Sequence, residues 1–498
     1  MNLLWASVGV ALLAYCAALY VGRVIRRKHV SQYTCALELD TLGRRLPHEK
    51  IKGTAVICGG SVGGLLAARV VIVEPEAWMN TPDAARTDPW NQGSKRSRVM
   101  QYESLHGTLA MGYNILTKLF PDIEEKSHAS GIKIIPSDFY VHMWGNVTRS
   151  PYAEYGGSLP KTMCAGRAGI ETLMRRLVLG GEYKNIRQII GTVTGVSRSP
   201  HNPGYLEEVT VRTSEGTQNI RAALVVGPAA ASLKWLRREG YGFADKYTRN
   251  QLPLDELKIA YDQKLHYSTL QFHVTPELGR KAPWPPDFDG DIILWVTAAS
   301  RRLLRKARLS SRSLVTEKPI PETFFAMLDM LDEVKDTMTC SRVRFPGSSH
   351  IRYERAVNLP SNWVALGDSV MRVNPVYGQG CSKAFYGALC LNKLLCNSTS
   401  IPKDFSKKYF SSHAEKIKPI WASLKAGDYA YKTTIPVPGE TLSEGSWARW
   451  YAKKLTILSF TDEQAGSAMW HVRMLLAPPI DVLQFGLILK VAWSLVKG

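Results

Sequence analysis

The stretch Trp363-Val364-Ala365-Leu366-Gly367-Asp368, followed by Asn374-Pro375-Val376-Tyr377-Gly378-Gln379-Gly380, decides how this chain is interpreted. It predicts an apolar strand that ends near Asp368, a loop that contains Pro375, and a helix over residues 381–395. The expected inner face of that helix is Ala384, Ala388, Leu391 and Leu395. A carboxylate at a strand end can accept hydrogen bonds from ligand hydroxyls, and glycines at a helix N-terminus leave N–H groups bare toward negative charge. The segment therefore predicts a site that holds an anion-forming ring against a helix end.

A second stretch, about 300 residues earlier, has the pattern of a dinucleotide fingerprint. Thr54–Cys58 predicts a buried strand, Gly59-Gly60-Ser61-Val62-Gly63-Gly64 a tight turn, and Val70–Pro75 a second strand with Glu74 at its end. Ser61 replaces the middle glycine, and Glu74 follows Gly59 by 15 positions, where about 20 is usual. Only 11 residues separate Cys58 from Val70, near the lower limit of about 10–12 for a parallel crossover. Either the first helix is two turns long or the gene model has lost a piece here.

Taken together and in this order, the two stretches resemble the flavin motifs of class A FAD-dependent monooxygenases, the family of para-hydroxybenzoate hydroxylase and squalene epoxidase. The resemblance implies that Asp368 holds the ribityl chain of FAD and that Pro375 lies near the isoalloxazine ring. It also implies that the backbone from Gly378 to Gly380 faces the pyrimidine end of that ring. An ordinary strand, loop and helix with a glycine-rich turn is the alternative for this segment.

Two segments between these stretches also resemble the family. Lys95–Gln101 is similar to the segment that contacts the ribityl and phosphate region, with Arg98 and Gln101 as the best matches. Gly166–Leu173 is similar to a helix start whose arginine, here Arg167, sits beside the cofactor. The alternative interpretation for each of these side chains is an ordinary surface residue. No catalytic acid–base residue and no metal ligand is predicted. The predicted cofactor-binding residues are Gly59, Ser61, Gly64, Glu74, Arg98, Gln101, Arg167, Asp368, Pro375, Gly378, Gln379 and Gly380.

The predicted fold is α/β, a two-domain flavoprotein. A Rossmann-like FAD-binding domain comes in two parts, 54–249 and 358–400, around a mixed substrate-binding sheet at 250–357. Within the first part, residues 188–196, 208–213 and 222–226 predict a small meander. Its last strand runs into Gly227-Pro228 without the acid that the family places there, which is a second departure at a cofactor-facing strand end. In the substrate sheet, residues 264–274 and 292–296 predict strands, and a basic run follows at 301–312.

Helices are expected from residue 401 to the C-terminus, either packed on the protein's own body or associated with a membrane. At the other end, Met1–Gly22 contains no charged side chain and would span about 33 Å as a helix. Arg23, Arg26, Arg27 and Lys28 follow at once. The pattern predicts a single-pass anchor over 1–22, a linker over 23–53 and a cytosolic body, at the endoplasmic reticulum in a eukaryote. A cleaved signal peptide is the main alternative.

Composition narrows the choice of partners. The 498-residue chain carries a formal charge of +20, which suits an anionic cofactor or an anionic membrane surface. The basic residues are scattered and no nucleic-acid-binding module is visible, so nucleic acid is not an expected partner. The eight cysteines form no Cys-x-x-Cys or zinc pattern, which fits a reducing compartment. Nothing in the sequence indicates an oligomeric state.

The function that the resemblance implies is oxygen insertion. NADPH would act as a transient co-substrate that reduces FAD, and one oxygen atom of dioxygen would enter the substrate by hydroxylation or epoxidation. The expected membrane anchor suggests a small apolar substrate such as a terpenoid or a prenylated aromatic. The alternatives are a flavin-dependent reductase or oxidase on the same fold, and a catalytically inactive membrane-tethered scaffold. A halogenase is a third alternative, but the chain has no Trp-x-Trp-x-Ile motif to support it.

Overall fold

The computed structural model describes most of the chain. The described residues are 2–42, 53–59, 71–76, 101–102, 104–138, 142–143, 146–179, 186–227, 232–272, 274–281, 322–396 and 400–496. Three predicted site residues (Ser61, Gly64 and Arg98) lie outside them, as do the expected strand at 292–296 and the basic run at 301–312.

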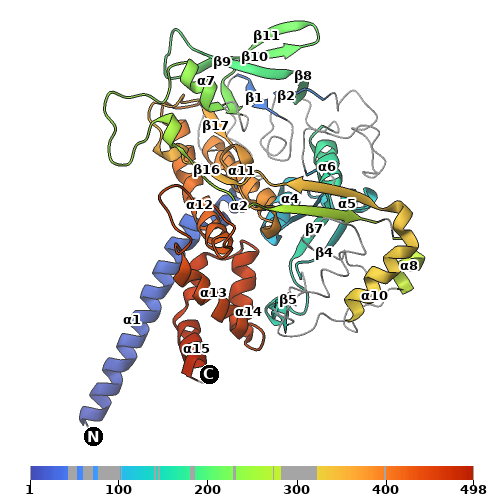
Figure 1. Cartoon of the computed structure of the whole chain (residues 1–498). Coiled ribbons are helices and arrows are strands. Elements are labelled where there is room, and N and C mark those ends of the chain that lie inside the picture. The colour runs from blue at the N-terminus through green and yellow to red at the C-terminus, as the bar shows by residue number, and fades with distance from the viewer. Residues whose placement is uncertain are drawn as a thin grey trace.

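A five-stranded parallel sheet forms the centre of the fold, in the order β17-β12-β1-β2-β8 (Figure 1). All four pairings in this sheet are parallel. Most of its strands are buried along their whole length, so they appear in the sequence as continuous apolar runs. The strands expected from residues 54–58, 70–75 and 363–366 are confirmed. The strands are β1 (Ala55–Cys58), β2 (Val71–Glu74), β8 (Arg187–Ile190), β12 (Leu224–Gly227) and β17 (Trp363–Ala365).

The expected meander has different strands from those predicted. Residues 188–196 belong to two strands that are separated at Gly191. The position requires glycine, because a Cβ there would come within 2.7 Å of Val211 Cγ1 and 2.8 Å of the Arg212 carbonyl oxygen. The first piece, β8, and the expected third strand, β12, both belong to the parallel sheet. The antiparallel meander consists of β9 (Thr192–Arg198), β10 (Leu206–Thr213) and β11 (Gly216–Arg221).

Besides the central sheet and the meander, the described residues form several smaller sheets. One of these sheets has the order β3-β7-β4 and another the order β13-β16-β18. After β18 come residues 373–379, which are called the cofactor loop below because of their predicted role. The strand expected over residues 264–274 forms as β14, paired antiparallel with β15. Remaining elements before β17 are α2 (Ala36–Thr41), β3 (Leu105–Thr108), α4 (Ala110–Leu119), α5 (Ile123–Ala129), β4 (Lys133–Pro136), β5 (His142–Met143), β6 (Asn146–Val147), β7 (Lys161–Gly166), α6 (Arg167–Leu179), α7 (Ser232–Arg238), β13 (Lys258–Tyr261), β14 (His266–Gln271), α8 (Pro276–Lys281), α10 (Glu322–Met330), β15 (Thr339–Arg344) and β16 (Ser348–Ile351).

The helix after the glycine-rich loop is α11 (Gly380–Cys396), close to the predicted span. It is buried on nearly all sides over its first two turns, from Cys381 to Gly387. The prediction of one inner face is therefore only partly correct: Ala384 and Leu391 are buried, whereas Ala388 and Leu395 are half-buried. Two elements precede the helix: the short strand β18 (Met371–Arg372) and a 3₁₀ turn, η8 (Pro375–Tyr377).

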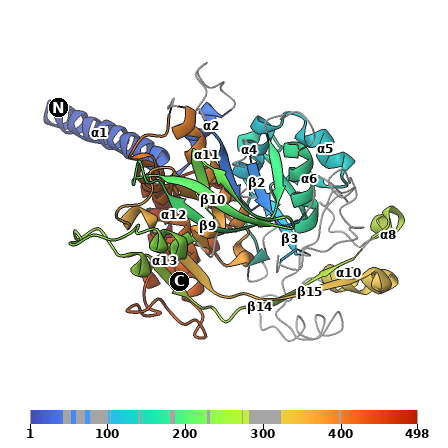
Figure 2. The same ribbon diagram turned by 90° about the horizontal axis from the view of Figure 1, so that it is seen from above.

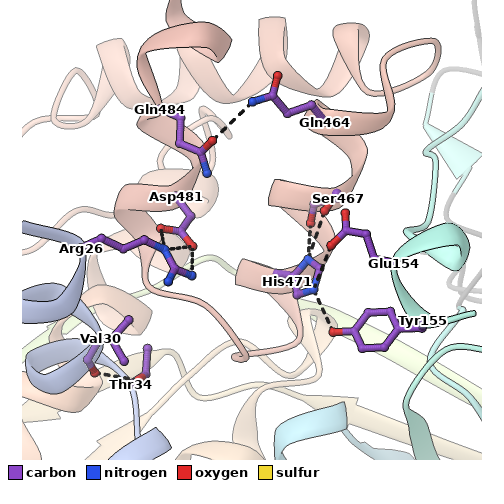
Figure 3. A network of polar contacts seen from close by, with 10 residues as sticks. All are labelled: Arg26, Val30, Thr34, Glu154, Tyr155, Gln464, Ser467, His471, Asp481 and Gln484. Atoms are coloured by element: carbon purple, nitrogen blue, oxygen red, sulfur yellow. Dashed lines mark hydrogen bonds and ion pairs between the residues drawn. The ribbon is translucent and has the colours of Figure 1, made fainter. Parts of the chain in front are cut away.

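The C-terminal region is helical, as predicted, and packs on the body of the protein. Its helices are α12 (Phe405–Asp428), α13 (Ser446–Leu458), α14 (Glu463–Arg473) and α15 (Phe485–Val496). His471 on α14 is 2.8 Å from the Tyr155 hydroxyl and also contacts Ser467 one turn earlier (Figure 3). These contacts join the C-terminal helices to the turn that precedes β7.

The N-terminal segment forms one long helix, α1 (Asn2–Tyr33), which projects from the body (Figures 1 and 2). Among the residues that the structure describes, none of the helices combines the length and the apolar character needed to cross a bilayer. The predicted single-pass anchor, and the localisation based on it, are corrected accordingly. The charged end of α1 instead docks on the protein itself: Arg26 pairs at 2.8 Å with Asp481 in the 3₁₀ turn η9 (Pro479–Leu483), just before α15 (Figure 3).

Candidate functional site

The two glycine-rich stretches lie at the carboxyl edge of the central sheet. Ile57, Val226 and Val364 lie in one row across β1, β12 and β17. Because these strands are parallel, Gly59 and Asp368, which follow β1 and β17, leave the sheet at the same edge. Glu74 ends β2 at that edge as well. Its side chain is buried, and its carbonyl oxygen accepts a hydrogen bond from Gly191. The two stretches therefore lie at the same edge of the sheet, and their role in binding a dinucleotide stays a prediction.

Asp368 borders an open space in an otherwise buried segment. Its side chain is 64% exposed, whereas its neighbours Gly367 and Ser369 are buried. Lys383 on α11 donates a hydrogen bond to Asp368 Oδ1 at 2.7 Å. Partial desolvation by the surrounding buried segment acts to raise the pKa of Asp368. The charge and hydrogen bond of Lys383, with smaller contributions from Arg167 and Arg372, outweigh this effect and lower the pKa. The carboxylate is thus held ionised, as an acceptor for hydroxyl groups.

Arg167 begins α6 and lies close to this carboxylate. Its backbone N–H donates to the carbonyl oxygen of Ser104, which ties the helix start to β3. Its side chain pairs with Glu171 at 3.5 Å and is 3.4 Å from His106 Nε2. Burial, with help from the Arg167 charge, lowers the pKa of His106 to about 4. The imidazole is therefore neutral at physiological pH, and Arg167 supplies positive charge next to Asp368.

The loop between β18 and α11 is fixed by its own hydrogen bonds. The side chain of Asn374 accepts a hydrogen bond from the backbone N–H of Val376, which caps the turn at Pro375. Gly378 then has φ of +67°, a left-handed conformation that favours glycine. The helix α11 begins two residues later, so its N-terminal N–H groups lie at the end of this loop.

Gln101, predicted to contact the cofactor, forms a side-chain hydrogen bond within the protein. Its side chain donates a hydrogen bond at 2.7 Å to the hydroxyl of Tyr267, in β14. Gln101 therefore joins the segment before β3 to the sheet that was expected to cover the substrate. Its role at the cofactor remains a prediction.

Two important residues were missed in the sequence. Lys383 interrupts an otherwise apolar helix start, and a charge at that position was the only available signal. Asp428, the last residue of α12, is buried and accepts hydrogen bonds from Asn374 and Tyr377 of the cofactor loop. Nothing in the sequence around Asp428 indicates this contact, because its partners lie more than 50 positions away.

Most of the described residues fit the FAD that the sequence resemblance implies. A Cβ atom placed on Gly59, Gly378 or Gly380 would meet no atom within 4 Å, so the backbone borders open space at both stretches. The buried Gln379 Oε1 has no hydrogen-bond partner among the described residues and can accept one from a ligand. At the end of β12 the fit is poorer: Gly227 lies against the indole of Trp363, where a side chain would come within 2.5 Å of the ring nitrogen.

Comparison with known proteins supports the fold assignment. No family model matches the chain. Protein Rv3254 of Mycobacterium tuberculosis is 23% identical over 459 residues, which cover 82% of this chain and 90% of that protein. The crystal structure of p-nitrophenol 4-monooxygenase PnpA from Pseudomonas putida DLL-E4 matches with a TM-score of 0.50 and 14% identity, over 86% of this chain and 99% of that chain. At this identity the likeness concerns the fold. The predicted α/β class, with a parallel sheet and a helical C-terminal region, is confirmed.

Proposed function

We propose that this protein is an FAD-dependent monooxygenase that uses NADPH and inserts one oxygen atom of dioxygen into a small apolar substrate. The observation that carries the proposal is the position of Gly59 and Asp368 at one edge of the parallel sheet. Their strands are separated by one other strand, so the strand ends lie about 10 Å apart. An extended dinucleotide is longer than this distance and can reach both stretches.

The chain's own residues supply binding and charge. Asp368, held ionised by Lys383, accepts hydrogen bonds from the ribityl hydroxyls, and Gly59 with Glu74 receives the adenosine diphosphate half. The N-terminus of α11 places N–H groups and the positive end of its dipole where negative charge on the ring would develop. Bound FAD would supply the redox chemistry and the activation of dioxygen.

The small sheets are the proposed substrate region. Tyr267 in β14 is tied to Gln101, and Tyr261 in β13 is tied to the cofactor loop through Asp428. These contacts place aromatic side chains of both strands next to segments that we assign to the cofactor. A cavity lined by such side chains would exclude water and favour an apolar substrate, such as a terpenoid or a prenylated aromatic. The proposal includes both hydroxylation and epoxidation.

Absorbance spectroscopy of the purified full-length protein tests the proposal. A bound flavin would give a yellow protein whose visible absorbance bleaches on addition of NADPH. A colourless protein that takes up no added FAD would refute the cofactor assignment and leave an inactive scaffold. Where flavin is bound, product analysis under ¹⁸O-labelled dioxygen separates the remaining alternative: an unlabelled product would indicate a reductase or oxidase.

A further inference from the structure

We propose that Lys383 is a positioning residue for the cofactor, because its buried ammonium fixes the Asp368 carboxylate and balances its charge when FAD covers it. This inference rests on the proposed function. Lys383 is not part of either glycine-rich motif, and the proposal assigns it a role.

Lys383 is a buried side chain that joins two elements of the site. Its side chain is 1% exposed, although it lies only one turn from the start of α11. The ammonium donates to Asp368 Oδ1 at 2.7 Å and also to the carbonyl oxygen of Met371 in β18. The lysine thereby connects the helix that follows the cofactor loop with the strand that precedes it, and it contacts Asp368 from the buried side.

The two members of this ion pair differ in their access to water. Lys383 is fully buried, whereas 64% of the Asp368 side chain is exposed. In the free protein, water therefore stabilises the carboxylate together with Lys383. A dinucleotide lying over Asp368 would remove that water, and a buried carboxylate without a partner is strongly unfavourable. The contribution of Lys383 consequently increases when the cofactor binds.

Other charged and titratable groups also face Asp368. Arg167 at the start of α6, Arg372 in β18, His106 in β3 and Cys381 in α11 interact with it electrostatically. Arg167 also pairs with Glu171, and Arg372 donates to the carbonyl oxygen of Gly347 at 2.9 Å. Among these groups, Lys383 has the largest effect on Asp368, because its ammonium makes a direct, short hydrogen bond to the carboxylate.

The test is Lys383→Met, which keeps the length of the side chain and removes the charge. Apoprotein of the wild type and of the variant is titrated with FAD, and the Kd is measured by flavin fluorescence between pH 5.5 and 8. We expect the variant to bind FAD at least tenfold more weakly at pH 8. In the apoprotein, 64% of the Asp368 side chain is exposed, so water can solvate its carboxylate when Lys383 is absent. The unfolding temperature of the apoprotein should therefore change little.

The pH dependence distinguishes positioning from packing. Without Lys383, burial under FAD would raise the pKa of Asp368, so binding would take up a proton. By linkage, the affinity of the variant for FAD should then approach that of the wild type as the pH falls from 8 to 5.5. In the wild type, Asp368 stays ionised, so this carboxylate should not make FAD binding depend on pH. A ratio of variant to wild-type Kd that is constant over this pH range would indicate altered packing and overturn the proposal.

A matched control is available in Lys416→Met. Lys416 is also buried and pairs with a buried carboxylate, that of Glu38, at 3.3 Å. We expect this variant to keep the wild-type Kd for FAD. Equal Kd values for the wild type and Lys383→Met would overturn the role of Lys383 alone. Failure of the wild type to bind FAD would instead overturn the proposed function, so the two failures are distinguishable. The flavin content of each protein as purified provides a second measurement if an apoprotein precipitates.

Discussion

Replacement of Asp428 by alanine should destabilise the protein strongly, because four hydrogen bonds converge on this buried side chain. Its carboxylate accepts from the Tyr261 hydroxyl at 2.9 Å and the Gln263 amide at 2.7 Å on the side of the small sheet. It accepts from the Asn374 amide at 2.7 Å and the Tyr377 hydroxyl at 3.3 Å on the side of the cofactor loop. Alanine would leave all four donors without this acceptor.

The expected magnitude follows from these contacts. A hydrogen bond to a charged group contributes about 1.5–3 kcal/mol, and an unsatisfied buried donor is costly. The four losses are not additive, because the donors share one acceptor and removal of the charge also removes its desolvation penalty. We therefore expect a loss of about 3–4 kcal/mol. With an unfolding entropy of about 2 cal/mol/K per residue, this corresponds to roughly 3–4 °C in Tm for a chain of 498 residues.

Thermal unfolding of the full chain, followed by circular dichroism, provides the measurement. Asp404→Ala is the matched control, because Asp404 precedes the same helix but its side chain is about half exposed. The control should unfold within about 1 °C of the wild type. A Tm for Asp428→Ala within the same limit would refute the reasoning, since it would mean that the four donors find other partners at little cost. The affinity for FAD should also fall, because Asn374 caps the cofactor loop.

Three further predictions concern other parts of the fold. Arg26→Ala should leave the buried Asp481 carboxylate without its ion-pair partner and expose α1 to faster limited proteolysis, and an unchanged rate would contradict the docking of this helix. Burial lowers the pKa of His413 to about 3, so the unfolded chain binds a proton first as pH falls. Stability should decrease by up to about 1.4 kcal/mol per pH unit for this residue below pH 6.5, and His413→Leu should show a shallower fall in Tm down to pH 4. Gly387→Ala should lower the Tm because the added methyl would lie 2.8 Å from Leu366 Cδ2; a Tm equal to that of the wild type would show that the helix can shift.

Local patterns in the sequence determined the main elements of the site. The apolar runs that became β1, β2 and β17 are recognisable because both faces of a parallel sheet are covered, and such strands contain few polar residues. Gly378 marks a turn that needs a left-handed residue, and the helix after Gly380 follows from its apolar content. Each of these features depends on a short segment and its immediate neighbours.

The tertiary structure alone decided which residues meet. The pairing of β17 with β12 and the contact of Asp428 with Tyr261, 167 positions away, are set by packing between distant segments. The ion pair of Lys383 with Asp368 joins residues only 15 positions apart, but it depends on how α11 packs against the turn that contains Asp368. The N-terminal helix shows the same limit: its apolar composition predicted an anchor, but the docking of Arg26 on Asp481 involves residues 455 positions apart. Hydropathy and spacing record what each segment prefers by itself, whereas burial, charge balance and hydrogen bonding depend on neighbours that only the folded chain supplies.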